Sequence, residues 1–543
     1  MDRRIFLKSL AAAGAAASLP FEIIHGRPQS RVDYLGLHPF LSAHADAVFI
    51  MKTTVSDKTD TAAKLAAGQA FASKVFMKSD TPGVPFDWNI SLKANLTCTS
   101  GTGGTAGGMG IRTDIPFVEG VIESVKGLGF PADNVSMREG NLLGDGYCPA
   151  ESEIGAAREM AERAGINFLA FASGRKAAEI TLDTIQEGSE AIWTDCPDGI
   201  MFRRIGSVAP FNAPKTWLLN IAKFKAHSMG LTLASKNIQG ACISPYIHFC
   251  ETLETTKKQP PKVLADFNPD FEQRIGELYQ QHAKSIPRWQ RPGTDARSGF
   301  GMESWAQRTC DWLSVQPAGL HVIEGIYGRN GNGFTLGPGP GDTPEEFMSN
   351  ILIFGMNPLL VDVIGMWMGG HEPGNFGLFH IARERGLLST FNPRAIPVFA
   401  WEDNEPSEAK LDDFERTPLR TPYLQKDYNG GTEELYHLVN EPFDYGSLAV
   451  SAPSRPDAFV LGQNHSNPFR GSTIIEYRMP RSGYARLEIF DSRGDRVGVL
   501  TDGWVSQGAH AATWVSGTHA PGAYFYRFMS GGTSVTRKMV LVR

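Results

Sequence analysis

A short stretch near the middle of the chain combines residue types that suit anion binding and acid–base or nucleophilic chemistry. Lys225 and His227 are two positions apart, so their side chains share one side of an extended segment. Lys236 and Asn237 follow after a short apolar run. Crowded cations bind an anion and also lower the pKa of a lysine, which prepares its amine as a base or nucleophile. We therefore predict His227 as general acid or base, and Lys225 or Lys236 as electrostatic stabiliser or nucleophile.

Two further segments place polar residues after predicted strands. Lys93 and Asn95 end one strand, and we predict that they bind the substrate together with Asn237. Glu324 ends another apolar strand just before a glycine-rich stretch, where it either helps to hold a divalent metal or neutralises the lysines. Asp362, in a following helix, is interpreted as a local hydrogen-bond partner.

Other interpretations of these residues stay open. Lys223 and Lys225 are equally compatible with solvated residues at a sheet edge, and His227 with an ordinary loop histidine. The glycine-rich run 101–110 offers backbone amides that can cradle an anion, but no Lys-Ser or Lys-Thr follows it as in a P-loop, so a surface loop is the simpler interpretation. The 6 cysteines form no Cys-x-x-Cys pair, which argues against an iron–sulfur cluster or a cysteine-based zinc site. The sequence identifies no other cofactor.

The elements that must position these residues alternate between strands and helices. Strands are predicted at 47–51, 90–96, 134–137, 167–171, 217–224, 321–326 and 350–354. Helices are predicted at 62–77, 115–128, 151–164, 358–368 and 376–385. This alternation predicts an α/β fold with an open, mostly parallel sheet and flanking helices. Sites in such folds lie beyond the carboxyl ends of the strands, which is where the polar residues occur.

The remaining parts of the chain follow other patterns. Short runs of period two recur in residues 461–543, separated by Gly, Pro, Asp or Asn, and predict an antiparallel β-sandwich. Residues 391–460, rich in Pro, Asp, Glu and Asn, are interpreted as an extension and linker. Residues 1–30 are interpreted as a targeting segment, and residues 45–390 are predicted to form the α/β domain.

Length and composition limit the classes of function. The chain has 543 residues, with 52 Lys and Arg against 58 Asp and Glu and a formal net charge of −6. No basic excess exists to neutralise phosphates, so nucleic acid is not an expected partner. No apolar run reaches the roughly 20 residues that cross a bilayer as a helix, so no transmembrane segment is expected in the mature protein.

The N-terminus resembles a twin-arginine export signal. The stretch Asp2-Arg3-Arg4-Ile5-Phe6-Leu7-Lys8 has paired arginines followed by Phe-Leu-Lys, and the Ala-rich run after it is too short for a membrane helix. The resemblance implies the twin-arginine translocase as a partner and export to the periplasm in a folded state. A basic amphipathic helix is the alternative.

Residues 461–543 resemble the C-terminal sorting domain of type IX secretion. The matching elements, in the family's order, are Asn467-Pro468-Phe469, Leu487-Glu488-Ile489-Phe490-Asp491, Gly522-Ala523-Tyr524-Phe525-Tyr526 and Lys538-Met539-Val540-Leu541-Val542. That family has an immunoglobulin-like fold similar to the flagellar hook-capping module. The resemblance implies the type IX secretion machinery as a partner and delivery to the outer-membrane surface or the extracellular space. Ser466 departs from the family, which usually has Pro there, and an ordinary carbohydrate- or protein-binding sandwich is the alternative.

Residues 45–390 resemble the family called domain of unknown function 362. The matching motifs are Lys93-Ala94-Asn95-Leu96, Thr113-Asp114-Ile115-Pro116, Lys223-Phe224-Lys225-Ala226-His227, Lys236-Asn237-Ile238-Gln239-Gly240, Glu324-Gly325-Ile326 and Val361-Asp362-Val363. The chain departs from the family at Ala94 for Pro, Ala226 for Thr and Glu324 for Asp. Glu324 keeps the charge but reaches further, which puts a tight metal geometry in doubt. The resemblance implies a shared site and names no substrate.

These observations lead to three hypotheses of function. The first is an exported α/β enzyme that acts on a small anionic or carbonyl-bearing substrate through the Lys, His and Asn residues above. The second is a surface protein that binds an anionic ligand without chemistry. The third is a structural or adhesive surface protein in which only the sandwich and linker matter.

Overall fold

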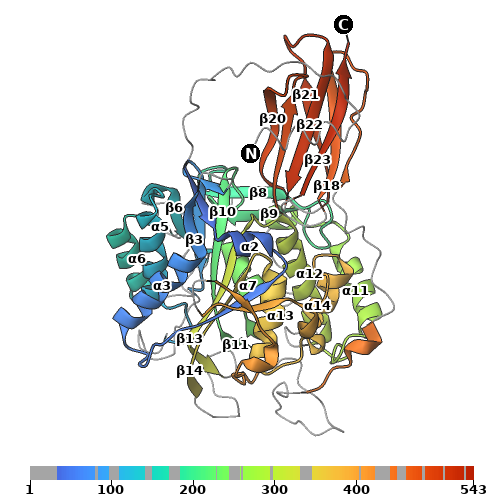
Figure 1. The fold of residues 1–543 in the computed structure, drawn as a ribbon. Coiled ribbons are helices and arrows are strands. Elements are labelled where there is room, and N and C mark those ends of the chain that lie inside the picture. The colour runs from blue at the N-terminus through green and yellow to red at the C-terminus, as the bar shows by residue number, and fades with distance from the viewer. Residues whose placement is uncertain are drawn as a thin grey trace. The chain divides into compact units, whose positions relative to one another are not determined.

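The computed structural model describes residues 33–79, 83–96, 109–140, 150–169, 184–227, 229–243, 257, 261–293, 298–330, 345–402, 405–421, 441–448, 460–479, 483–505, 508–530 and 533–542. They divide into two compact units, one within residues 33–453 and one within residues 454–543 (Figure 1). The predicted targeting segment lies outside the described residues. Within the described ranges, no helix combines the length and the apolar character needed to cross a membrane.

A large sheet runs through the unit within 33–453 (Figure 1). In spatial order its described strands are β16 (Ser407–Glu408), β15 (Val398–Ala400), β2 (Val48–Lys52), β14 (Glu345–Gly355), β13 (Gly319–Asn330), β10 (Thr216–Lys223), β5 (Asn89–Ala94), β6 (Val135–Arg138) and β7 (Asn167–Leu169). All neighbours from β13 to β7 are parallel, whereas β14 runs antiparallel to both β13 and β2. The mixed α/β class is confirmed, and the sheet itself is mixed.

Helices lie on both sides of this sheet (Figure 1). On one side are α3 (Thr61–Val75), α5 (Ile115–Gly127) and α6 (Ala150–Ala164). On the other side are α7 (Ala234–Ile238), α12 (Gly299–Val315), α13 (Pro358–Met368) and α14 (Gly377–Glu384), with α11 (Phe271–His282) packed on α12. Every residue of β10 and β13 is buried, as expected for strands covered on both faces.

Two glycines allow α3 and α5 to cross closely. A Cβ added to Gly68 would lie 2.1 Å from the carbonyl oxygen of Phe117, and one added to Gly120 would lie 2.1 Å from that of Leu65. Only glycine permits this approach of one backbone to the other. The crossing holds the N-terminal end of α5, where Asp114 joins the polar network described below.

The chain makes one excursion from the carboxyl end of β10. After Phe224 it forms a hairpin of β11 (Lys225–His227) and β12 (Gly230–Thr232), and then α7. The four predicted site residues of the middle segment therefore stand on the hairpin and on α7. Smaller elements complete the unit: the sheet of β3 (Phe76–Ser79), β1 (Tyr34–Leu37) and β4 (Val84–Pro85), the pair β8 (Ala191–Asp195) and β9 (Arg204–Val208), and the helices α2 (Pro39–Ala43) and α10 (Pro261–Leu264).

Part of the segment interpreted as an extension and linker belongs to the sheet. Within 391–460, β15 pairs in parallel with β2, and β16 pairs antiparallel with β15. These strands add an edge to the sheet beyond β2, the first predicted strand. The short length of β15 and β16 explains why the sequence pattern gave no sign of them.

The unit within 454–543 is built of antiparallel sheets. One sheet contains β17 (Val460–Leu461), β18 (Ser472–Met479) and β21 (Gly508–Val515), and the other contains β20 (Arg496–Val505), β19 (Gly483–Phe490), β22 (Gly522–Ser530) and β23 (Thr533–Leu541). Apolar residues of both sheets form one buried cluster, including Ile475, Trp514, Leu487 and Tyr526. The strands predicted from period-two patterning are confirmed.

Candidate functional site

A row of polar side chains crosses the centre of the sheet. In the parallel register, Lys93 of β5 lies beside Asn220 of β10, and Asn220 lies beside His321 of β13. Neighbours in register point to the same face, and Asn237 of α7 covers this row. Its side-chain amide donates to Asn220 Oδ1 at 2.7 Å and to the carbonyl oxygen of Lys93 at 3.1 Å. Asn220 in turn contacts His321 Nδ1 at 3.1 Å.

Four of the predicted site residues form one hydrogen-bonded chain. Lys225 Nζ donates to Asn95 Oδ1 at 3.2 Å, and Asn95 Nδ2 donates to Asn237 Oδ1 at 3.2 Å. The same Asn237 oxygen accepts from Lys93 Nζ at 3.2 Å. The structure therefore brings together residues that lie up to 144 positions apart in the sequence. Lys225 also donates to the carbonyl oxygen of Ile111 at 2.6 Å.

The interpretation of the lysines as solvated edge residues is wrong. Lys223 is 0% exposed and Lys225 is 1% exposed. Lys223 is the last residue of β10 and Lys225 lies two positions beyond it. β10 is a central strand whose neighbours β5 and β13 shield it from water on both edges. His227 and Lys236 keep part of their surface accessible. The partly exposed groups are thus the ones that a ligand reaches first.

Glu139 is a site residue that the sequence analysis missed. It follows β6, is 2% exposed, and its Oε2 accepts from Lys93 Nζ at 2.7 Å and from the backbone N–H of Leu96 at 3.1 Å. Burial lowers the pKa of Lys93, and the attraction of Glu139 opposes that effect. The rule that sites follow the strands applied to the predicted strand 134–137 as well, so the signal was present.

Like charges gather around Lys225 and His227. Burial lowers the pKa of Lys225 well below its ordinary value of 10.5, and the nearby charges of Lys236 and Lys223 lower it further. Burial also lowers the pKa of His227 well below 6.5, with added repulsion from Lys236 and Lys225. The amine and the imidazole are therefore biased toward their neutral, basic forms.

The ring of His227 has a defined tautomer in its neutral form. Its Nδ1 accepts the backbone N–H of Met229 at 3.1 Å, so the ring proton sits on Nε2. A neutral imidazole of this kind donates a hydrogen bond from Nε2. Its backbone carbonyl is held by the hydroxyl of Thr421 at 2.5 Å.

Glu324 belongs to a network centred on Lys223. Its Oε2 accepts from Lys223 Nζ at 2.7 Å and from the backbone N–H of Asp114 at 3.1 Å, while Oε1 accepts from the N–H of Ile326 at 2.8 Å. Asp114 pairs with Lys223 at 3.1 Å and with Lys64 at 2.7 Å. Burial opposes the charge of Lys223, but the attraction of Asp114 and Glu324 outweighs it and raises the pKa.

This network fits one of the two predicted roles of Glu324, the neutralisation of a lysine. In the part of the chain that the structure describes, no group of three or more His, Cys, Asp or Glu side chains is arranged to hold a metal ion. The metal role of Glu324 stays a prediction. The glycine-rich run, apart from residues 109 and 110, lies outside the described residues.

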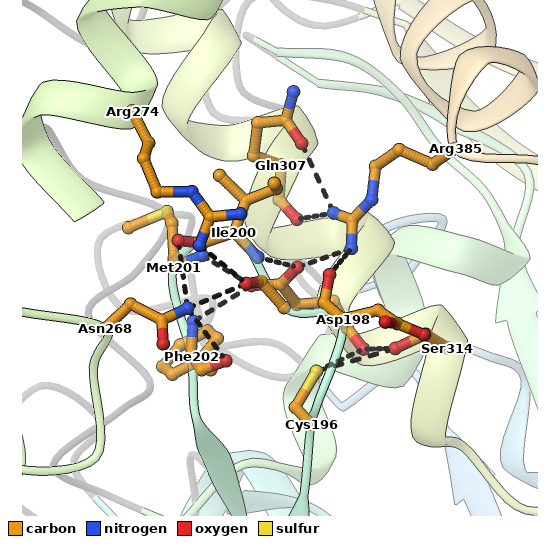
Figure 2. A network of polar contacts seen from close by, with 12 residues as sticks. Cys196, Asp198, Ile200, Met201, Phe202, Asn268, Arg274, Gln307, Ser314 and Arg385 are labelled. Carbon is orange, nitrogen blue, oxygen red and sulfur yellow. Dashed lines mark hydrogen bonds and ion pairs between the residues drawn. The ribbon is translucent and has the colours of Figure 1, made fainter. Parts of the chain in front are cut away.

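A second polar network lies on α12 and contrasts with the first (Figure 2). Asp311 is 0% exposed, and its carboxylate accepts the backbone N–H groups of Ile200, Met201 and Phe202 at 2.8–3.0 Å. It also pairs with Arg385 at 2.7 Å. Here the buried charge has a counter-charge and a full set of donors, so the geometry is that of a structural clamp.

Comparison with known proteins does not name the site. No family model matches the chain, and no curated protein matches it. The function therefore has to be argued from the geometry above.

Proposed function

We propose that this protein is an exported enzyme that acts on a small anionic or carbonyl-bearing substrate at the cluster of Lys225, His227 and Lys236. The observation that carries the proposal is the gathering of three basic groups whose charges repel one another. Mutual repulsion costs the folded protein stability, and a bound anion relieves that cost. The location beyond the carboxyl ends of parallel strands adds support, because ligands bind there in open α/β sheets.

The residues divide the chemistry among them. Lys236, partly exposed, attracts the anionic end of the substrate, and the Nε2–H group of His227 donates to a carbonyl oxygen. Lys225, with its lowered pKa, acts as base or nucleophile. As nucleophile, its nitrogen bonds to the carbonyl carbon, and the carbonyl oxygen collects the two amine protons and leaves as water, which gives an imine.

Calorimetric titration with pyruvate, which is both an anion and a ketone, tests anion binding. Binding should take up protons near neutral pH, because the anion raises the lowered pKa values of His227 and Lys225. Titrations in buffers of different ionisation enthalpy measure this uptake. Lys236→Met should weaken binding at least tenfold. The matched control is Lys215→Met, an exposed lysine paired with Asp87, which should change nothing.

The same ligand separates an enzyme from a binding protein. If Lys225 is a nucleophile, sodium cyanoborohydride should trap pyruvate on this residue, and peptide mapping by mass spectrometry should locate the adduct. A protein that only binds anions shows proton uptake without an adduct. Absence of proton uptake with both pyruvate and inorganic phosphate, together with absence of a pyruvate adduct, would overturn the proposal.

The proposal includes the export and the cellular location of the protein. The motifs at residues 2–8 support export through the twin-arginine translocase, and those in residues 461–543 support an immunoglobulin-like sorting domain of type IX secretion. The antiparallel strands of the C-terminal unit are compatible with that domain. The motifs in residues 45–390 support membership of the domain of unknown function 362 family. Native mass spectrometry of protein from its own cell envelope would test the mature termini and any bound metal or ligand together.

A further inference from the structure

The helix that carries Lys236 is capped by a residue from another helix. Asp362 of α13 is 3% exposed, and its two carboxylate oxygens accept the backbone N–H groups of Ala234 at 2.7 Å and Ser235 at 2.9 Å. These are the first two residues of α7. The acceptor is thus 127 to 128 positions away in the sequence from the amides that it satisfies.

The short helix α7 has no local substitute for this cap. The residue before it is Leu233, which makes no side-chain cap hydrogen bond. The first amides of a helix have no partner within the helix, and burying them without an acceptor costs free energy comparable to a lost hydrogen bond. Asn220 of β10 holds the same turn by donating to the carbonyl oxygen of Ala234 at 3.0 Å. The start of α7 is therefore fixed by β10 and α13 rather than by its own sequence.

Two and three residues after Ala234, α7 presents Lys236 and Asn237, the groups that act in the site. Asn237 bridges Lys93 and Asn95, and Lys236 lies close enough to lower the pKa values of Lys225 and His227. A displacement of the first turn of α7 is transmitted to both residues, because the helix is only five residues long.

We propose that Asp362 is a positioning residue of the anion site: by capping α7 from α13, it sets where Lys236 stands relative to Lys225 and His227. This role rests on the proposed function of the cluster. It goes beyond the local hydrogen bond expected from the sequence, since the cap reaches a different element and controls the placement of a charge.

The titration of His227 in the unliganded protein reports this placement. The charged groups that act on its ring are Lys236 of α7 and Lys225 of β11. If Lys236 moves away, the repulsion weakens and the titration midpoint of His227 rises. Lys236→Met removes the charge completely and therefore gives the reference change: the titration midpoint of His227 should rise by about one pH unit. Nuclear magnetic resonance of histidines labelled at Cε1 measures the midpoint, and His227→Gln assigns the signal.

The test variant is Asp362→Asn, and its matched control is Asp311→Asn. Both replace a buried carboxyl group that accepts backbone N–H groups with an amide, and both should lower the melting temperature. Asp362→Asn should raise the His227 midpoint by at least half of the rise seen in Lys236→Met, whereas Asp311→Asn should leave it unchanged. Asp362→Asn should also weaken pyruvate binding at neutral pH several-fold.

The outcomes separate the cap from the anion site. An unchanged His227 midpoint in a folded Asp362→Asn protein overturns the positioning role, even if wild-type protein binds pyruvate. If Asp362→Asn does not fold, Asp362→Glu replaces it, since the longer side chain keeps the carboxylate but displaces the first turn of α7. A normal midpoint in Asp362→Glu then overturns the role. A raised midpoint in a protein whose wild type binds no anion keeps the cap and rejects the proposed function.

Discussion

Two polar regions of this protein bury charged side chains, and the surroundings of those charges differ. The carboxylate of Asp311 accepts three backbone N–H groups and pairs with the guanidinium of Arg385. Burial opposes the charge of Arg385, but Asp311 outweighs it, and the pKa of Arg385 rises. Around Lys225, burial and neighbouring cations act in the same direction, and the pKa falls well below its ordinary value.

The difference indicates which region is built for stability and which for binding. Buried charges that are already paired stabilise the fold, and a bound ion would gain little by interacting with them. Accumulated like charges cost stability, and a protein keeps such an arrangement where function requires it. Four predictions test this contrast, in order of decreasing effect.

The largest loss of stability is expected when the ion pair between Asp311 and Arg385 is broken. Asp311→Ala removes the acceptor of three backbone N–H groups and leaves Arg385, which is mostly buried, without its carboxylate. The free energy of unfolding should fall by about 4 kcal/mol, as measured by urea denaturation at neutral pH. Pyruvate binding at low temperature should stay normal, because the network does not contact the site. A loss below 1 kcal/mol would show that the Asp311 network is not a structural clamp.

The second prediction concerns another balanced group, His282. It bridges Glu303 at 2.8 Å and Glu384 at 2.7 Å. Burial alone would lower its pKa, but the hydrogen bonds with the two carboxylates outweigh burial and raise the pKa to about 9. Because the folded pKa lies above the ordinary 6.5, the stabilisation is full below pH 6.5 and is lost as the pH rises to about 9.

The expected size of this loss is about 2 to 3 kcal/mol, discounted because Glu384 is exposed. Urea denaturation of wild type and His282→Gln between pH 6 and pH 9.5 measures it. The wild type should lose its advantage over the variant across this range. Two parallel stability profiles would contradict the assignment.

The sequence predicted the sheet and the strand ends well, because both depend on local patterns. Continuous apolar runs marked β10 and β13, and the polar residues near the predicted strand ends pointed to Lys225 and Glu324, although β13 in fact continues past Glu324 to Asn330. The antiparallel direction of β14 left no local mark, since direction depends on which strands pair. Helix α12 was missed: it is buried on nearly all sides, and its polar residues Glu303, Gln307 and Asp311 are buried in hydrogen bonds instead of facing water.

The site was predicted only as far as residue types allow. Lys93, Asn95 and Asn237 do converge with Lys225, as the grouping of polar residues near predicted strand ends suggested. The separation of Lys223 into a neutralised network with Glu324 and Asp114 depends on tertiary contacts. The role of Asp362 required knowing which helix it faces, and no spacing rule supplies a partner 128 positions away.

The third prediction concerns Gly240, which lies against the buried ion pair of Lys93 and Glu139. A Cβ added to Gly240 would lie 2.4 Å from Glu139 Oε1 and 2.9 Å from Lys93 Nζ, so Gly240→Ala should force this buried ion pair to move. The expected cost is about 2 kcal/mol of unfolding free energy, with weakened pyruvate binding. Gly276→Ala is the control for an added Cβ that meets nothing within 4 Å, and inside helix α11 it should stabilise the protein by up to about 1 kcal/mol. A Gly240→Ala protein as stable as wild type would indicate that the Lys93–Glu139 pair adjusts freely.

The smallest expected effect is an increase in the free energy of unfolding, whereas the other changes lower it. The folded pKa of Lys225 lies below that of the unfolded chain, so at neutral pH its protonation favours unfolding, and the penalty shrinks as the pH rises toward 10.5. Lys225→Met should remove this penalty but leave Asn95 Oδ1 and the carbonyl oxygen of Ile111 without a donor, for a net stabilisation of about 1 kcal/mol at pH 7. Urea denaturation at pH 7 and pH 9.5 should show the stability advantage of the variant narrowing, while the pyruvate adduct disappears and proton uptake on binding decreases to the share of His227. A variant that is less stable than wild type at pH 7 would place Lys225 with the structural clamps and would remove the basis for treating the two regions as different.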